Sequence, residues 1–324
     1  MINWTTGGPA RVAAIGECMI ERREEGTDLK SVPDIPRNFS GDTLNTLTYA
    51  ARLLGKDRAD LFYITAVGED EDSSAMLAAW EAEGINTGFT RRLRDKLPGS
   101  YTIATGPDGE RRFDYDRDRS AARELFRDDF ATSLKDSLKG FHLVYLSGIS
   151  FAILNNEYRE SLLDLLNSLR QAGVIIVYDP NYRAALWKSP RDARDWAERI
   201  YREADAALPG FDDEEALFND ATPEHTCARL ADLGITEIVV KNGSSPCTVA
   251  TGKDINRFPV TGQNRVVDTT AAGDSFNAGY ISARLCGRDI ATSVRAGQSL
   301  SELVIQYPGA IIPRSETPQI FKLV

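Results

Sequence analysis

Short apolar segments alternate with amphipathic segments through most of the second half of the chain. An apolar run at 142–146 is followed by a segment in which leucines recur at helical spacing, and then by a second apolar run at 174–178. The same order recurs as far as the apolar run at 237–240. Strands that alternate with helices are joined by crossovers, which gives a mostly parallel sheet with helices on both faces. The sequence therefore predicts an α/β fold that binds ligands at the carboxyl ends of its strands.

The same reasoning extends to the other elements. The patterns predict strands at 11–20, 61–67, near 206 and at 247–250, and helices at 43–54, 72–83, 192–202, around 214 and 228, at 273–285 and at 290–306.

Two polar stretches do not fit a central sheet. The first covers about residues 21–36. The second covers about 88–118, where strands at 101–105 and 112–116 flank a Gly-Pro-Asp-Gly turn and predict a hairpin. We expect the two stretches to form a small β flap, or lid, over a pocket, within a single domain that spans residues 1–324.

Composition limits the classes of function. Of the 324 residues, 42% are hydrophobic and 27% are charged, which is typical of a globular protein with a large core. The net charge of -10 argues against a nucleic-acid partner, which requires a clustered basic surface. The four cysteines form no close pair, which argues against a zinc or redox site and fits a reducing compartment. No apolar run approaches the ~20 residues of a membrane span and no secretion signal opens the chain, so we expect a cytoplasmic protein without a membrane partner.

The segment Val266–Phe276, VVDTTAAGDSF, places small residues immediately before a predicted helix. We expect Asp268 or Thr269 to cap this helix, which would leave the amides of residues 271–273 without helical partners. Small side chains let an anion approach such amides, and the helix dipole favours it. Asp274 at the edge of an anion site is explained by phosphoryl transfer, in which the amides stabilise the moving group and the carboxylate accepts the proton of the attacking alcohol.

A simpler interpretation of the short pattern is an N-capped helix with an aspartate in its first turn. The acidity of an ordinary aspartate, with a pKa of about 3.9, does not exclude the chemical interpretation. In a loose transition state the alcohol becomes acidic only as its bond to phosphorus forms.

The complete string resembles the second signature of the PfkB/ribokinase family of sugar and nucleoside kinases, D-T-x-(G/A)-A-G-D-x-F. Further segments are similar, in order along the chain, to kinases of this family that act on 2-dehydro-3-deoxygluconate: Ile15–Glu21, Gly41–Thr46, Tyr145–Ser150, Asn181–Trp187 and Val304–Arg314. Neither a Walker-type G-x-x-x-x-G-K-[ST] loop nor an H-R-D catalytic loop occurs. The resemblance implies a ribokinase-like fold and ATP-dependent phosphorylation of this sugar acid at its terminal primary hydroxyl. It also implies Mg²⁺ and leaves open a monovalent cation such as K⁺.

By resemblance, the catalytic group consists of a base, Asp274, and an anion hole formed by Ala271, Ala272 and Gly273. The resemblance also implies a set of residues that bind the sugar acid, namely Gly41, Asp42, Asn45, Tyr101, Tyr115, Arg117, Arg183 and Asp274. Carboxylate and amide side chains suit hydroxyl groups, and arginine suits the carboxylate that a neutral sugar lacks.

Three of these positions have other interpretations. Asp42 is also a good N-cap for the helix that follows it. Tyr115 and Arg117, two residues apart, would share one face of a strand, but the surrounding ERRFDYDRDR is a charged run of the kind found on solvated surfaces. Ser40 stands where the family has a glycine, which would be costly if the position required a positive φ.

The nucleotide side is assigned in the same way. The residues that resemble nucleotide-binding positions are Asn181, Lys241, Asn242, Gly243, Ala271, Gly273 and Gln298. Asp212 and Glu215 resemble a Mg²⁺-side motif, although an acidic helix start would look the same. Asp268 and Thr270 resemble a monovalent-cation site of some relatives, and Pro246 replaces a glycine of the phosphate-side loop.

Two other functions remain open on the sequence. One is a kinase of a neutral sugar or nucleoside, similar to fructokinase or ribokinase, and the other is a non-catalytic sugar-acid sensor on the same fold. The gluco and galacto epimers of the sugar acid are not distinguished. A homo-oligomer could form if the edge strands of the flap paired across a two-fold axis.

Overall fold

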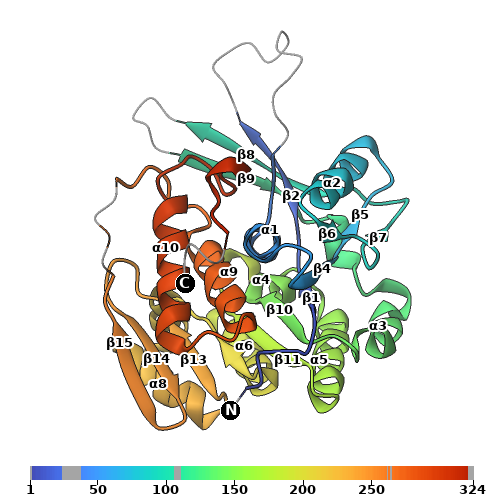
Figure 1. The fold of residues 1–324 in the computed structure, drawn as a ribbon. Coiled ribbons are helices and arrows are strands. Elements are labelled where there is room, and N and C mark those ends of the chain that lie inside the picture. The colour runs from blue at the N-terminus through green and yellow to red at the C-terminus, as the bar shows by residue number, and fades with distance from the viewer. Residues whose placement is uncertain (1, 24–37, 106–110, 261, 263–264, 320–324) are drawn as a thin grey trace.

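The computed structural model describes residues 2–23, 38–105, 111–260, 262 and 265–319. Its main feature is a nine-stranded sheet, in which the strands follow the order β15-β14-β13-β12-β11-β10-β1-β4-β6 (Figure 1). The strands are β1 (Ala10–Ile15), β4 (Ala59–Ile64), β6 (Ile85–Asn86), β10 (Leu143–Ser147), β11 (Ile175–Asp179), β12 (Ala206–Ala207), β13 (Glu237–Val240), β14 (Cys247–Thr251) and β15 (Asp254–Phe258). Neighbouring strands run parallel except for the antiparallel pairs β13–β14 and β14–β15. The predicted mostly parallel α/β sheet is confirmed.

Helices cover both faces of this sheet because successive strand residues point to opposite sides. Ile15, Leu146 and Tyr178 face one side and pack in one core cluster with the apolar stripes of α3 (Phe130–Leu138), α5 (Asn156–Gln171), α6 (Pro190–Glu203) and α8 (Pro223–Asp232). Ala14 and Val177 face the other side and share a core with α1 (Asp42–Leu54), α2 (Glu71–Ala82), α9 (Ala272–Leu285) and α10 (Ile290–Val304). The shorter α4 (Gly148–Ala152) and α7 (Phe211–Phe218) follow strands β10 and β12.

A second sheet of four strands lies beyond one end of the large sheet (Figure 1). Its order is β3-β2-β8-β9, with β2 (Met19–Arg23), β3 (Asn38–Ser40), β8 (Gly99–Thr105) and β9 (Arg111–Asp116). Tyr101 pairs with Tyr115 in the antiparallel β8–β9 register, so the predicted hairpin is confirmed. Its turn at 106–109, and residues 24–36 of the other predicted flap stretch, lie outside the described residues.

Two predicted strands are wrong as single elements. The run 11–20 divides into β1 and β2, which belong to different sheets. Between them Gly16 lies so close to Thr43 of α1 that a Cβ there would overlap the threonine side chain. The run 61–67 likewise divides at Thr65 into β4 and β5 (Ala66–Val67), which pairs with β7 (Arg91–Arg92). An apolar run alone does not show where a chain passes from one sheet to another.

Helices α9 and α10 approach each other through facing glycines. A Cβ on Gly279 would lie 2.7 Å from the carbonyl oxygen of Ala296, and one on Gly297 would lie 2.8 Å from that of Phe276. This close approach of α9 and α10 is possible because neither position carries a side chain.

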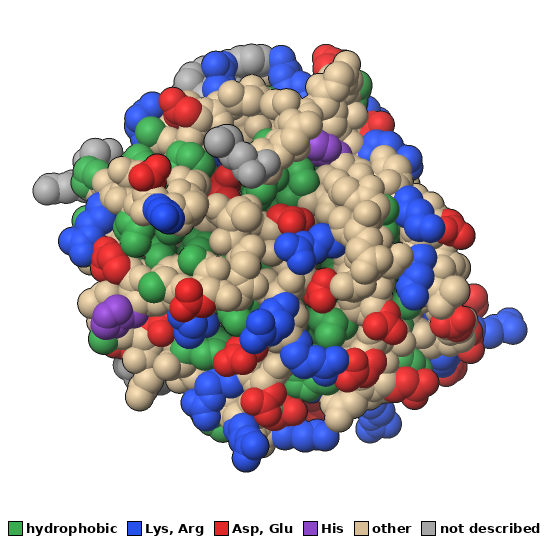
Figure 2. Space-filling model, turned by 90° about the horizontal axis from the view of Figure 1, so that it is seen from below, with side chains coloured by type: hydrophobic (Ala, Val, Ile, Leu, Met, Phe, Trp, Pro, Cys, Tyr) green, Lys and Arg blue, Asp and Glu red, His purple; other side chains and the backbone are tan. Residues whose placement is uncertain are grey.

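The face of the molecule opposite the small sheet carries acidic and basic side chains interspersed with one another (Figure 2). This arrangement does not provide the continuous basic surface that binds nucleic acid. Within the described ranges, no helix combines the length and apolar character needed to cross a bilayer.

Candidate active site

A cavity of about 920 Å³ lies between the small sheet and the carboxyl ends of the large sheet's strands. Met19, Ser40, Tyr101 and Tyr115 line it from the small sheet. Asp179 at the end of β11 and Lys241 just after β13 line it from the large sheet, and residues 271–274 line it from the start of α9. The cavity is therefore at the strand ends, where the sequence predicts ligand binding.

The first turn of α9 has a different cap from the expected one. Its N-cap is Ala271, which has a left-handed φ of 60° and makes no side-chain capping bond. Asp268 instead accepts hydrogen bonds from the Thr270 amide (3.0 Å), the Thr270 hydroxyl (2.7 Å) and the Gly309 amide (2.7 Å). The expected cap by Asp268 or Thr269 is therefore wrong, because the left-handed turn at Ala271 begins the helix instead.

The amides at this helix tip are partly occupied. Ala272 donates its amide to the carbonyl of Thr269 at 3.1 Å, so the expectation of three unpartnered amides is wrong for this residue. The amides of Ala271 and Gly273 have no hydrogen-bond partner within the described ranges, and both residues line the cavity. Two amides and the dipole of α9 remain to bind an anion.

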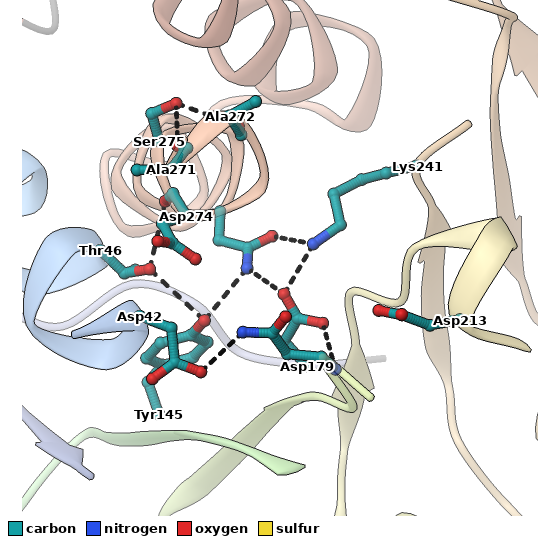
Figure 3. A network of polar contacts seen from close by, with 12 residues as sticks. Asp42, Thr46, Tyr145, Asp179, Asp213, Lys241, Ala271, Ala272, Asp274 and Ser275 are labelled. Carbon is teal, nitrogen blue, oxygen red and sulfur yellow. Dashed lines mark hydrogen bonds and ion pairs between the residues drawn. The ribbon is translucent and has the colours of Figure 1, made fainter. Parts of the chain in front are cut away.

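The Asp274 carboxylate lies beside this tip and faces the cavity (Figure 3). Its Oδ2 accepts a hydrogen bond of 2.8 Å from Nδ2 of Asn45 on α1. Burial and then the nearby Asp42 carboxylate raise the pKa of Asp274 to about 7, and Asn45 and Lys241 oppose the shift only in part. A carboxylate with this pKa is a much better proton acceptor near neutral pH than an ordinary aspartate.

Lys241 lies on the opposite side of the helix tip. Its ammonium donates to Asp179 Oδ2 at 2.7 Å and to Asn277 Oδ1 at 3.0 Å (Figure 3). Asn277, on α9, donates in turn to Asp179 Oδ2 at 2.6 Å and to the Tyr145 hydroxyl at 3.0 Å. Sequence reasoning assigned no role to Asp179, Asn277 or Tyr145. Only Asp179 had a usable signal in the sequence, since it comes directly after the apolar run 174–178.

Asp42 and Asn181 contact each other across the cavity floor. Asn181 Nδ2 donates to Asp42 Oδ2 at 2.7 Å, and the Asn181 amide donates to Asp179 Oδ1 at 3.2 Å. Asn181 holds a left-handed φ of 35°, which is strained for a residue with a side chain. The residue expected near the phosphates thus contacts the proposed sugar-side aspartate. Asp42 itself begins α1 after Gly41, and the Gly41 N-cap makes no side-chain bond, so Asp42 is not the N-cap.

The expected difficulty at Ser40 does not arise. Ser40 lies in strand β3, where backbone is extended, and it does not need the freedom of glycine. Its hydroxyl donates to Asn45 Oδ1 at 3.3 Å, which helps to orient the amide that contacts Asp274. The neighbouring Gly41 is required, because a Cβ there would overlap the backbone carbonyl of Glu17.

The two predicted carboxylate-binding arginines differ in position. Arg183 is exposed, lines the cavity and lies 3.7 Å from Asp213 Oδ1. Arg117 is 9% exposed, follows the end of β9 and pairs with the buried carboxylate of Glu17, so its guanidinium does not line the cavity. The structure thus places the Arg117 guanidinium on Glu17 and not among the residues that line the cavity.

The two tyrosines from the small sheet both line the cavity. Tyr115 is 52% exposed, and its ring is 5.8 Å from that of Tyr101. Tyr101 is buried and donates its hydroxyl to Glu21 Oε2 at 2.7 Å. Burial and then the Glu21 charge raise the pKa of Tyr101 well above its usual range, so it remains a neutral donor.

The acidic residues of α7 are arranged differently from the expectation. Asp212 lines the cavity, but Glu215 is exposed and does not. Asp213, which sequence reasoning did not select, is half-buried and lines the cavity. Burial and then the charge of Asp179 raise the pKa of Asp213 to about 6.

The carboxylates of Asp212 and Asp213 at the cavity wall suit Mg²⁺, which takes few protein ligands when phosphates and water complete its coordination shell. The described residues contain no cluster of three or more typical metal-ligating side chains.

The remaining residues assigned to the nucleotide side also contribute to the cavity. Asn242, Gly243 and Gln298 all line the cavity. Gln298 Nε2 donates to the backbone carbonyls of Phe258 and Pro259 at 3.4 and 3.3 Å.

The sequence profile described as pfkB family carbohydrate kinase matches residues 9–318. The chain belongs to the pfkB family of carbohydrate kinases. Among pfkB relatives, the chain is 41% identical to the 2-dehydro-3-deoxygluconokinase of Dickeya dadantii (strain 3937) over 310 residues, covering 95% of this chain and 98% of the relative. It is 40% identical to the enzyme of the same name from Escherichia coli (strain K12) over 311 residues, covering 95% and 99%.

A solved structure supports the pfkB fold. The chain superposes with a TM-score of 0.80 on a putative Ribokinase II from E. coli in complex with ATP and Mg²⁺, with 22% identity and 97% of each chain covered. At this identity the likeness establishes the ribokinase-like fold alone.

Proposed function

We propose that this protein is an ATP-dependent kinase that phosphorylates 2-dehydro-3-deoxy-D-gluconate at its terminal primary hydroxyl to give the 6-phosphate. The observation that carries the proposal is the helix tip, where free amides and a proton-accepting carboxylate face one cavity. The choice of substrate is supported by the relatives of 40–41% identity that cover nearly the whole chain and by the arginine at the cavity wall.

In the proposed reaction the sugar hydroxyl oxygen attacks the terminal phosphorus of ATP. The bond from that phosphorus to the bridging oxygen breaks and ADP leaves, while the hydroxyl proton passes to Asp274. The amides of Ala271 and Gly273 and the Lys241 ammonium would stabilise charge on the moving phosphoryl group. Asp42 and Asn45 would orient the sugar.

The same proposal includes the cations. Mg²⁺ would neutralise phosphate charge, with Asp212 and Asp213 as the carboxylates placed to hold it or its water ligands. A K⁺ site at Asp268 and Thr270 would support the loop before α9. Replacing K⁺ with a large organic cation in the assay tests this part, because a rate that does not change excludes a K⁺ requirement.

The small sheet is proposed to act as a lid within a single domain. It contributes Tyr101 and Tyr115 to the cavity wall. Its closure would exclude water, which otherwise competes with the sugar for the phosphoryl group. We further propose a cytoplasmic location and, through the edge strands of this sheet, a homo-oligomer.

A coupled ADP-release screen tests the function. Mg-ATP is supplied with 2-dehydro-3-deoxy-D-gluconate, its galacto epimer, gluconate, fructose or ribose. The proposal predicts turnover with the 2-dehydro-3-deoxy sugar acid and little with neutral sugars. Turnover restricted to fructose or ribose would support the neutral-sugar kinase, and binding of the acid without turnover would support the sensor.

Replacing Arg183 with alanine is expected to raise KM for the sugar acid by about 10- to 100-fold, the equivalent of one lost charged hydrogen bond. KM for ATP should change little, because the side chain would face the substrate carboxylate. Steady-state kinetics with each substrate varied in turn measures the two values. Arg191→Ala serves as the control, since this side chain is 86% exposed and its ion pair with Asp195 is long. Equal effects of Arg183→Ala on both KM values would exclude it as the carboxylate ligand.

Phosphorylation is expected to slow as the pH falls below about 7. Asp274 must be ionised to accept a proton, and its raised pKa of about 7 means that the ionised form is lost as pH falls through that value. The pH profile of kcat/KM from about pH 5 to pH 9 reports this ionisation in the free enzyme. Asp42→Asn should move the acid limb to lower pH, because it removes a neighbouring negative charge. A profile that remains flat to pH 5 would show an aspartate of ordinary acidity.

A further inference from the structure

Asn277 is fully buried on α9, one helical turn after Asp274, and every part of its amide is used. Its oxygen accepts from the Lys241 ammonium, and its nitrogen donates to Asp179 and to the Tyr145 hydroxyl. If the Asn277 side-chain amide were flipped by 180°, its N–H groups would face the Lys241 ammonium and its carbonyl oxygen would face the Asp179 carboxylate. Its orientation is therefore fixed by charge on both sides.

The Lys241 ammonium lies directly against the helix tip. A Cβ built on Gly273 would be 3.6 Å from its Nζ, and the lysine side chain is 14% exposed and lines the cavity. Two of its three N–H groups are used by Asp179 and Asn277. The third is available to an anion at the tip.

The charge around this ammonium makes its position important. Six acidic residues line the cavity, namely Asp42, Asp179, Asp212, Asp213, Asp274 and Glu302. ATP and a sugar acid both bring further negative charge. An ammonium that relaxed toward one of these carboxylates would leave the phosphoryl group against an acidic wall.

We propose that Asn277 is a positioning residue that holds the Lys241 ammonium against Gly273, between Asp179 and the path of the phosphoryl group. The inference rests on the proposed kinase function, in which Lys241 acts on the phosphates. Asn277 itself touches neither substrate. It acts through the lysine, and Tyr145 and Asp179 fix its amide from β10 and β11.

A double-mutant cycle separates positioning from general support of the fold. Asn277→Leu removes the amide at similar volume, and Lys241→Met removes the ammonium. We expect kcat to fall about 100-fold for Lys241→Met, as for loss of one charge-stabilising group, and at least about tenfold for Asn277→Leu. The double variant should be no slower than Lys241→Met alone. Ser282→Ala is the control, because Ser282 is equally buried on α9 and lies outside the network.

The pH profile provides a second readout. The charged and titratable groups that influence Asp274 are Asp42, Tyr49, Tyr145, Asp179 and Lys241, and Lys241 is the cation among them. Lys241 and the hydrogen bond from Asn45 both favour the ionised form of Asp274. Displacing or removing the ammonium should therefore move the acid limb of kcat/KM to higher pH in both single variants. Ser282→Ala should leave it in place.

Several outcomes would overturn the inference. Effects of the two substitutions on kcat that multiply in the double variant would show independent roles. A loss of activity in Asn277→Leu that follows its folded fraction, with an unchanged pH profile, would show a structural role alone. Asn277→Ala replaces the leucine variant if that variant does not fold.

Binding of Mg-ATP by calorimetry makes the test independent of turnover. Asn277→Leu and Lys241→Met should each weaken it, and the double variant should bind no more weakly than Lys241→Met alone. Losses that multiply in the double variant, or undiminished binding by Asn277→Leu, would contradict the inference. Absence of wild-type turnover with every sugar would instead contradict the proposed function, while the binding cycle would still decide the role of Asn277.

Discussion

Asp274→Asn is expected to lose turnover by about 10²- to 10⁴-fold, the usual contribution of a general base, and to bind Mg-ATP nearly as the wild type does. The amide has the same shape as the carboxylate, and its oxygen can still accept the hydrogen bond from Asn45. It cannot accept the proton of the sugar hydroxyl. Coupled ADP-release kinetics measures the turnover, and calorimetry measures the nucleotide affinity.

The matched control for this substitution is Asp136→Asn, at a 91% exposed side chain on α3. It should leave both quantities unchanged. The residual activity of Asp274→Asn should also lose its dependence on pH near 7, because the group responsible is gone. Turnover close to that of the wild type would exclude Asp274 as the base.

Arg117→Met is expected to lower the free energy of unfolding by about 3–5 kcal/mol, since it leaves a buried carboxylate without its positively charged partner. The Glu17 side chain is 1% exposed, and Arg117 and the Ser120 hydroxyl are its partners. Glu17 lies between β1 and β2, and Arg117 follows β9, so the pair joins the small sheet to the large one. Denaturation in urea measures the change.

Two further variants test whether the lost ion pair causes this effect. Arg183→Ala removes an exposed arginine and should change the unfolding free energy by no more than about 0.5 kcal/mol. Glu17→Gln combined with Arg117→Met should recover part of the loss, because the remaining group is then uncharged. An Arg117→Met variant of normal stability with a raised KM for the sugar acid would contradict the buried pair and favour a direct contact with substrate.

The fold was predictable where the evidence is local. Buried parallel strands appear as continuous apolar runs, and helices such as α5 carry a leucine stripe, so the alternation predicts the sheet. Strand β15 was missed because it is mostly exposed and polar and is held by pairing with β14. The division of 11–20 between two sheets depends on the approach of α1, which no local pattern records.

The site was predictable in part for the same reason. The helix tip and Asp274 belong to one continuous string, and the structure places them together at the cavity. Asp179, Asn277 and Tyr145 come from separate elements, so their convergence depends on the fold. The rotation of α7 about its axis brings Asp213, and not Glu215, to the cavity. A short run of acidic residues does not show which of them faces the cavity.

A crystal structure with Mg²⁺, a non-hydrolysable ATP analogue and 2-dehydro-3-deoxy-D-gluconate tests the central claim most directly. The account predicts that the terminal phosphate contacts the amides of Ala271 and Gly273, with the primary hydroxyl of the sugar within hydrogen-bond distance of Asp274. A terminal phosphate bound away from this helix tip, or a sugar whose primary hydroxyl points away from Asp274, would contradict it.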